Sequence, residues 1–390
     1  MGEGGPLRGR RVVDFSLYLP GPLASRALTD LGAEVIKVEP PKGDPVSDLM
    51  PGVYEFVNRG KRAVRLDLKQ EEGRELALAL AATADAVLEA FRPGTASRLG
   101  VGFEAVRERN PRVVYGSISS FGQFGPDRDR PGHNIGYEAA GGSWAATLAA
   151  GEAPHQNPLA AADVSGGLLA ALTVCAHLSD PEREAVHLDV SLGEALGFVA
   201  APRWGTFLAE GDTSPDPTSF PNYAPGNALY ETADGRHLAL AAVEDKFWQA
   251  LCGWLERPDL AAPPYDDHHG RMLHRGELGA ALADAFRRLP LEEIVAAGNR
   301  HDFPAEPVRG FEGILGNPHL AERRALRTLD GGGVVPDFPV LSDECRSFSS
   351  DRQPDLADDE RWLLEELGVD SDSEARLRDL GVLQQTRREA

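Results

Sequence analysis

The chain has 390 residues, of which 42% are hydrophobic, and a formal net charge of −21 at pH 7. Its length exceeds what one hydrophobic core usually supports, so we expect two domains, and its negative charge argues against nucleic acid or an anionic membrane as a partner. Three widely spaced cysteines without a CxxC pair, and the lack of a signal peptide or of an apolar run long enough to cross a membrane, favour a soluble cytoplasmic protein without a disulfide framework.

Short apolar runs rich in β-branched residues predict β-strands through the first 120 residues. These runs are 11–17, 33–39, 62–68, 84–91 and 112–119. Helical spacing lies between them at 22–32 and 69–84, and the first of these segments ends on a glycine typical of a helix C-terminus. Strand–helix–strand units of this length predict an α/β fold with a doubly wound parallel sheet.

The composition changes from about residue 215. A turn-rich linker there leads into a predicted β-hairpin with its turn at Asp234-Gly235, and helices continue to about residue 300. We therefore expect the N-terminal part of a large domain over 1–215 and a smaller domain over 225–325. The remaining segment, 326–390, is too short for a third domain and is expected to return to the large one.

Segments rich in proline and glycine follow the predicted strands, where doubly wound sheets bind their ligands. No GxGxxG, GxSxG, P-loop or HExxH motif accompanies them. We therefore expect neither a nicotinamide nor a flavin cofactor, and no metal.

His133 and Asp163 are the most useful acid–base candidates. His133 follows a glycine in a loop, and Asp163 precedes an apolar helix. Each has an ordinary interpretation, His133 as a structural loop residue and Asp163 as a helix N-cap. As a pair they would suit proton removal and return at a carbon next to a carbonyl, whereas Asp163 alone would suit attack on an acyl group. The residues by themselves leave these alternatives open.

The chain resembles the family III CoA-transferases, or CaiB/BaiF proteins, in order along nearly its whole length. The segments that carry the resemblance include GRRVVDFSLYLPGPLASRALTDLGAEVIKVEPPKGDP, ADAVLEAFRPGTASRLGVG, NPRVVYGSISSFGQFGP, VHLDVSLGEAL and YETADGRHLALAAVEDKFW. The resemblance implies a Rossmann-like large domain formed by both termini, a smaller α+β domain, and a homodimer of two interlocked rings.

The resemblance also implies an acyl-CoA substrate, with coenzyme A bound along the strand ends as part of that substrate. The basic residues that would hold it are Lys37, Arg59, Arg62, Arg92 and Arg98. In a chain this acidic, an anionic pyrophosphate needs such locally concentrated cations.

Three further residues take catalytic roles by the same resemblance. The family's catalytic aspartate corresponds to Asp163, and the histidine of the GHD motif of α-methylacyl-CoA racemases corresponds to His133 in the sequence GHN. A small-domain glutamate that hydrogen-bonds this histidine corresponds to Glu244. The chain therefore resembles the racemase branch most, with Asn134 as a departure from the motif.

The resemblance implies a racemase that inverts the α-carbon of a 2-methyl-branched acyl-CoA by two-base proton exchange through an enolate. We expect backbone N–H groups around Asp163 to stabilise the enolate oxygen. The alternative is a CoA-transferase that moves CoA between carboxylic acids through an aspartyl anhydride on Asp163. A non-catalytic CoA-binding or scaffolding relative is a third possibility.

Overall fold

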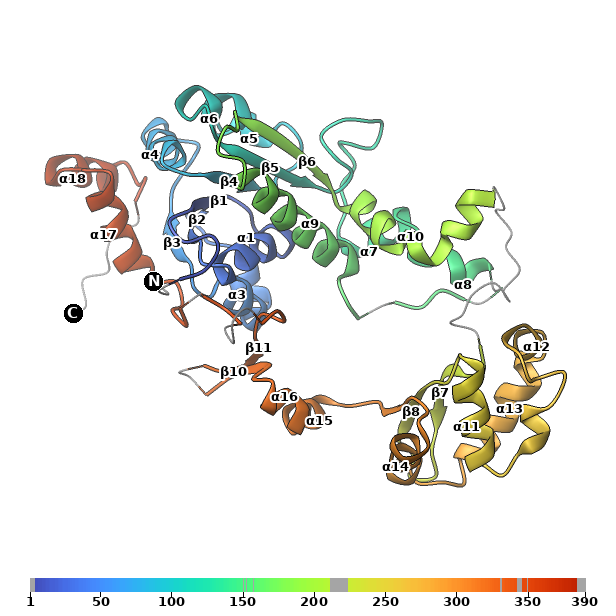
Figure 1. Cartoon of the computed structure of the whole chain (residues 1–390). Helices are drawn as coiled ribbons and strands as arrows, with labels where there is room; N and C mark the ends of the chain where they lie inside the picture. Colours follow the sequence, from blue (N-terminus) through green and yellow to red (C-terminus); the bar gives the residue numbers. More distant parts are fainter. Residues whose placement is uncertain are drawn as a thin grey trace. The chain divides into compact units, whose positions relative to one another are not determined.

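The chain divides into two units (Figure 1). Two clusters of buried hydrophobic residues lie in unit 1 and one lies in unit 2. The computed structural model describes residues 4–149, 151, 153–156, 158–210, 224–329, 332–341, 346–348 and 350–383. Unit 1 comprises Met1–Ser143, His155–Ala200 and Glu322–Ala390, and unit 2 comprises Trp144–Pro154 and Ala201–Ala321. Unit 1 is thus built from both ends of the chain.

Unit 1 is organised around a six-stranded parallel sheet with the order β3-β2-β1-β4-β5-β6. The strands are β1 (Arg11–Asp14), β2 (Glu34–Glu39), β3 (Arg62–Arg65), β4 (Ala86–Glu89), β5 (Val114–Ser119) and β6 (Val186–Ser191). This is the strand order of a Rossmann-like sheet, whose switch point lies between the first and fourth strands. The predicted α/β class and the first five strands are confirmed, and the structure adds β6.

Helices cover both faces of this sheet because consecutive strand residues point to opposite sides. Val12 and Val35 belong to one core, and their neighbours Val13 and Ile36 belong to the other. The first core is closed by α1 (Pro20–Asp30) and α9 (Ala161–Leu178), and the second by α4 (Glu71–Ala82), α6 (Phe103–Arg109), α17 (Leu356–Glu366) and α18 (Ser371–Asp379).

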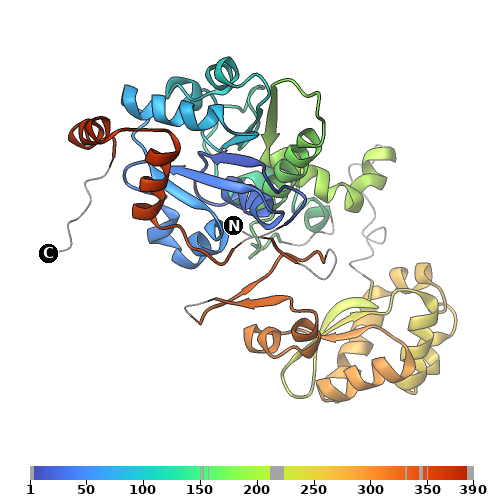
Figure 2. The same cartoon turned by 60° about the vertical axis from the view of Figure 1, so that its left-hand side comes forward.

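The C-terminal helices join unit 1 through a buried carboxylate. Asp359 on α17 accepts a hydrogen bond from the backbone N–H of Ala63 at 3.0 Å and pairs with Arg352. Leu363 and Leu364 of the same helix lie in the core beneath the sheet. Figure 2 shows this red helix against the blue strands.

The other elements of unit 1 are short and lie largely in its loops. They are α2 (Val46–Leu49), α3 (Pro51–Asn58), α5 (Thr95–Arg98), α7 (Asn134–Ala140) and the antiparallel pair β10 (Leu326–Thr328) and β11 (Val334–Pro336). The long helix α10 (Leu192–Glu210) begins in unit 1 and ends in unit 2.

Unit 2 contains a three-stranded antiparallel sheet with the order β7-β8-β9. The predicted hairpin is present, and Gly235 takes the left-handed conformation (φ 71°) in its turn. The core of this unit is formed with helices around the buried Trp248. The elements are α8 (Ala145–Ala149), β7 (Asn227–Glu231), β8 (His237–Ala241), α11 (Asp245–Trp254), the 3₁₀ helix η3 (Pro258–Ala261), α12 (His268–Leu273), α13 (Arg275–Phe286), α14 (Leu291–His301), β9 (Ala305–Pro307), α15 (Phe311–Leu315) and α16 (Pro318–Glu322).

Helix α9 shows that the expectation of no apolar run long enough to cross a membrane is wrong. Among the described residues, α9 is the one helix that is long and apolar enough, with a mean hydropathy of 1.5 over 18 residues. It packs as a core helix: a Cβ on Gly166 would lie 2.3 Å from the side chain of Leu192, and one on Gly167 would lie 2.5 Å from the carbonyl oxygen of Pro20. Gly166 thus lies against the start of α10, and Gly167 lies against the start of α1.

Candidate active site

A cavity of about 320 Å³ lies within unit 1 at the carboxyl ends of the parallel strands. Its walls come from the loops after β1, β4 and β5 and from the starts of α7 and α9. The polar residues among its lining are Tyr18, Arg92, Ser119, Ser120, His133, Asn134, Tyr137 and Asp163. This is the edge at which a doubly wound sheet binds ligands.

Asp163 is the acidic residue of this cavity and lies in the first turn of α9. The N-cap residue of that helix is Ala160, so Asp163 is not the helix cap that one interpretation of the sequence suggested. Burial and, secondly, the negative charge of Glu138 raise the pKa of Asp163 to about 6. Within the described chain the Asp163 carboxyl group makes no hydrogen bond, so it is available to a ligand.

Two side chains of α7 close the N-terminus of α9. The Asn134 side-chain oxygen accepts hydrogen bonds from the N–H groups of Ala162 (3.1 Å) and Asp163 (3.2 Å). Glu138 accepts from the N–H of Ala161 (2.9 Å) and from the side-chain amide of Asn134 (2.8 Å). The expectation that these backbone N–H groups stabilise an enolate oxygen is therefore wrong, because their hydrogen bonds are already taken.

His133 lines the same cavity as Asp163. It is the N-cap residue of α7, and its carbonyl oxygen accepts the N–H of Gly136 at 2.8 Å, which leaves the imidazole free of a capping role. The imidazole is exposed and meets the ring of Tyr18 edge to face, with 6.4 Å between the ring centroids. The structure thus brings an imidazole from the loop before α7 and a carboxyl group from α9 to one cavity.

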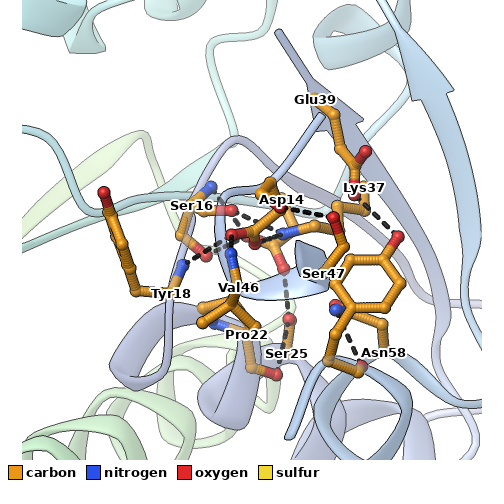
Figure 3. A network of polar contacts seen from close by, with 12 residues as sticks. Asp14, Ser16, Tyr18, Pro22, Ser25, Lys37, Glu39, Val46, Ser47 and Asn58 are labelled. Carbon is orange, nitrogen blue, oxygen red and sulfur yellow. Dashed lines mark hydrogen bonds and ion pairs between the residues drawn. The ribbon is translucent and has the colours of Figure 1, made fainter. Parts of the chain in front are cut away.

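Tyr18 is held in an unusual backbone conformation beside His133. Its φ of 66° lies in the left-handed region, which costs a non-glycine residue about 1 kcal/mol or more. Its N–H donates to the side chain of Asp44 at 3.3 Å, which helps to fix that conformation. The Tyr18 ring then points away from the buried polar residues around Asp14 (Figure 3).

The loop that carries Tyr18 is anchored by those buried polar residues. The carboxylate of Asp14 accepts hydrogen bonds from the hydroxyl groups of Ser16 and Ser25 (Figure 3). The ammonium of Lys61 lies 3.3 Å from the same carboxylate. Burial alone would raise the pKa of Asp14, but the charges of Lys61 and Lys37 hold it below its usual value. The carboxylate therefore stays ionised and keeps the loop in place.

Lys37 and Arg59, two expected CoA contacts, are buried and do not line the cavity. The Lys37 ammonium donates to the carbonyl oxygen of Ser16 at 2.7 Å and pairs with Asp44 at 3.0 Å. The nearest acidic partner of Arg59 is Asp351, at 3.9 Å. All three guanidinium nitrogens of Arg59 are buried without a hydrogen-bond partner in the described part of the chain, and the expected contacts of Lys37 and Arg59 with CoA stay predictions.

Arg62 lies away from this cavity, and its expected contact with CoA stays a prediction. It is the first residue of β3, so it lies at the amino end of the sheet, opposite the cavity of His133 and Asp163. There it lines a larger cavity of about 690 Å³, pairs with Asp359 at 3.3 Å and stacks on the ring of Trp362. Most charged side chains of that cavity are in ion pairs, some with one another and some with Asp359, and none of the candidate acid–base residues lines it.

Arg92 and Arg98 follow β4 at the carboxyl edge. Arg92 is exposed, lines the cavity and makes no ion pair in the described chain. Arg98 is exposed on α5 and donates to the hydroxyl of Thr95 at 2.7 Å. Of the expected basic residues, these two are the ones placed to meet an anion at this edge.

Glu244 belongs to unit 2, where it is the N-cap residue of α11. Its carbonyl oxygen accepts the N–H groups of Phe247 and Trp248, but its carboxylate caps nothing and is exposed. The carboxylate is therefore free for a role outside its own helix.

Sequence reasoning missed Tyr18, Ser119 and Glu138. Ser119 is 6% exposed, lines the cavity, and its hydroxyl has no hydrogen-bond partner in the described part of the chain. None of the three lies in a recognisable motif of the sequence. In the described residues, no group of three or more His, Cys, Asp or Glu side chains is arranged to hold a metal ion.

Comparisons with known proteins place these residues in context. A family model described as CoA-transferase family III matches residues 7–360. A succinyl-CoA:mesaconate CoA-transferase of Haloarcula marismortui is 31% identical, over 94% of this chain and 98% of that protein. Human α-methylacyl-CoA racemase is 30% identical over 93% of each chain. A solved CaiB/BaiF family protein from Brucella suis is 28% identical and superimposes with a TM-score of 0.83, over 94% of this chain and 100% of that one.

Proposed function

Because the chain belongs to CoA-transferase family III, whose enzymes act on CoA thioesters and need no metal, we propose that it is an acyl-CoA racemase with His133 and Asp163 as its two bases. The observation that carries this proposal is that the two side chains line one cavity at the carboxyl edge of the sheet. The substrate would be a 2-methyl-branched acyl-CoA. Acyl transfer needs only the carboxyl group of Asp163. Inversion at the α-carbon needs a second base on the other face, and His133 supplies one.

In one direction, neutral His133 removes the α-proton, and the C–H electron pair moves into the carbonyl to form an enolate. Protonated Asp163 then donates its proton to the other face of the α-carbon, which inverts the centre and leaves a carboxylate. In the reverse direction the carboxylate is the base and the imidazolium is the acid. The pKa of Asp163 of about 6 supports this exchange, because both forms are populated near neutral pH.

The enolate oxygen needs a donor other than the amides at the start of α9. The buried hydroxyl of Ser119 lines the cavity and has no partner in the described chain, so we assign it this role. Ser119→Ala then lowers kcat by about tenfold or more and changes KM little, because the donor acts on charge that develops in the transition state.

The CoA part of the substrate would lie against Arg92 and Arg98, whose cations suit phosphate groups. Glu244 would orient His133 from the small domain, in the homodimer that the family resemblance implies. The exposed apolar side chains Val164, Leu168 and Leu172, which recur along one face of α9, support a further contact surface of this kind.

The second candidate is CoA transfer, favoured by the name of the Haloarcula relative. In this reaction the Asp163 carboxylate attacks the thioester carbonyl and expels the CoA thiolate, which leaves a mixed anhydride. The thiolate attacks the Asp163 carbonyl of that anhydride, releases the first acid and forms an aspartyl-CoA thioester. The second carboxylate attacks the carbonyl of the aspartyl-CoA thioester and expels the thiolate, which forms a new mixed anhydride. The thiolate then attacks the carbonyl of the second acid, which gives the product thioester and releases the Asp163 carboxylate.

The deciding experiment incubates the protein with branched acyl-CoA substrates in heavy water. The racemase incorporates deuterium at the α-carbon without an added acid, and both His133→Ala and Asp163→Ala abolish exchange. His155→Ala is the matched control, because this histidine is exposed and is not part of the cavity. The proposal fails if no acyl-CoA exchanges, or if His133→Ala retains activity while Asp163→Ala does not and hydroxylamine traps Asp163 during turnover.

A further inference from the structure

Helix α9 has no capping side chain of its own. Its N-cap is Ala160, and no side chain from that residue accepts a hydrogen bond from the first turn. Helix N-termini normally find such acceptors because their first N–H groups have no partner inside the helix. Here the acceptors come from another helix, since Asn134 and Glu138 of α7 take the N–H groups of Ala161, Ala162 and Asp163.

We propose that Asn134 and Glu138 are positioning residues for Asp163: they close the N-terminus of α9 from α7, and thereby leave the Asp163 carboxyl group facing the cavity without amide donors of its own. The inference rests on the proposed function only in that Asp163 is the reacting group. Neither residue touches the substrate in this proposal.

The physical effect is on the charge state of Asp163. Free N–H groups in the first turn of a helix stabilise a nearby carboxylate, through hydrogen bonds and through the helix dipole. Asn134 removes that stabilisation by occupying the donors, and Glu138 adds an opposing negative charge. Glu138 is 1% exposed, and its carboxyl group accepts two hydrogen bonds, at 2.8 Å and 2.9 Å.

The other groups that face Asp163 are few. Tyr137 on α7 interacts electrostatically with Asp163, and burial is the largest cause that raises the pKa of its phenol. His133 from the loop before α7 and Arg92 from the loop after β4 line the same cavity. A cation at either position would favour the Asp163 carboxylate. The negative charge of Glu138 acts in the opposite direction and disfavours it.

The arrangement also explains why Asn134 stands in the GHN sequence. Its amide donates to Glu138 at 2.8 Å while its oxygen accepts from the helix. An aspartate at position 134 would bring two carboxylates to that distance, and like charges so close cannot both ionise. With a carboxylate at position 138, the side chain at position 134 must donate a hydrogen bond to it and accept hydrogen bonds from the α9 amides. The side-chain amide of asparagine does both.

The roles of Asn134 and Glu138 can be tested by variants that remove or exchange their hydrogen-bond donor and acceptor groups. Glu138→Gln keeps the acceptor oxygen and removes the charge, whereas Asn134→Ala frees the amides of Ala162 and Asp163. The double variant Asn134→Asp, Glu138→Gln restores a donor facing an acceptor with their places exchanged. The exposed Glu108 provides the control variant Glu108→Gln, which removes the same charge far from the cavity.

The readout is the protonation of Asp163 in the full-length protein, measured by the pH dependence of its carbodiimide-driven labelling with an amine and quantified by mass spectrometry. We expect the midpoint to fall by about one pH unit in Glu138→Gln and in Asn134→Ala, and to stay near the wild-type value in the double variant and the control. At pH 7 a one-unit fall lowers the labelling rate about tenfold.

The proposal is overturned if Glu138→Gln, which preserves the shape of the site, leaves the midpoint unchanged. It is also overturned if the double variant behaves like Asn134→Ala, because exchange of polarity should restore the closure. Midpoints in the expected order support the positioning role even if no α-proton exchange or CoA transfer is detected. In that case the proposed function fails and the inference about Asp163 stands.

Discussion

Replacing Asp163 by asparagine should make the folding stability less dependent on pH. Burial and Glu138 raise the pKa of Asp163 from 3.8 to about 6, so the folded chain binds a proton more tightly than the unfolded chain. The free energy of unfolding therefore falls as pH rises through the interval between these values, and the loss is complete above pH 6. The full difference corresponds to about 3 kcal/mol, and about 1.4 kcal/mol of it develops between pH 5 and pH 7.5.

The measurement is urea unfolding of the wild type and Asp163→Asn at pH 5.0, 6.0 and 7.5. The variant should gain about 1.4 kcal/mol relative to the wild type across this interval, whatever constant difference the substitution itself adds. Asp372→Asn, on the exposed start of α18, is the control and should show the same difference at each pH. A wild-type to Asp163→Asn difference that does not change with pH would refute the reasoning, since it would mean that Asp163 titrates alike in both states.

Arg92→Ala should raise the KM for acyl-CoA about tenfold or more, with a smaller change in kcat, because the exposed guanidinium lines the cavity. An unchanged KM in steady-state kinetics would show that Arg92 does not contact CoA. Tyr18→Gly should relieve the backbone strain at φ 66° and raise the free energy of unfolding, measured by denaturant titration, by about 1 kcal/mol. It should also lower the rate of α-proton exchange in the heavy-water assay, because the ring beside His133 is lost. Gly167→Ala should lower the free energy of unfolding by about 2 kcal/mol, because its Cβ would lie 2.5 Å from the carbonyl oxygen of Pro20, and a melting temperature equal to that of the wild type would contradict this.

The parallel sheet could be predicted from the sequence because its first five strands are short, apolar and separated by helices. Their residues are buried on both sides, which produces continuous runs such as Val12 and Val13. The sixth strand, VHLDVS, was not predicted, although its alternation, with His187 and Asp189 exposed, is typical of a half-buried strand. Its place in the sheet depends on pairing with β5, a contact between distant parts of the chain that has no local signature.

The site was harder to predict than the fold, because nearness in sequence does not reveal the end of the sheet at which a side chain lies. Arg62 begins its strand and Arg92 follows one, so they lie at opposite ends although both are arginines close to strands. The buried ion pair of Lys37 with Asp44 depends on a loop that returns over β2. The closure of α9 by α7 likewise joins residues 28 or 29 positions apart and has no local signature.

Racemisation and CoA transfer, the two candidate reactions, make opposite demands on the charge state of Asp163. A nucleophile must be a carboxylate, whereas an acid that returns a proton to carbon must be protonated. With a pKa of about 6, roughly a tenth of Asp163 is protonated at pH 7, so neither form is scarce enough to forbid its reaction. The charge state of Asp163 therefore does not choose between the reactions. That choice depends on a second base at the α-carbon, and the imidazole of His133 is the group that this cavity offers for it.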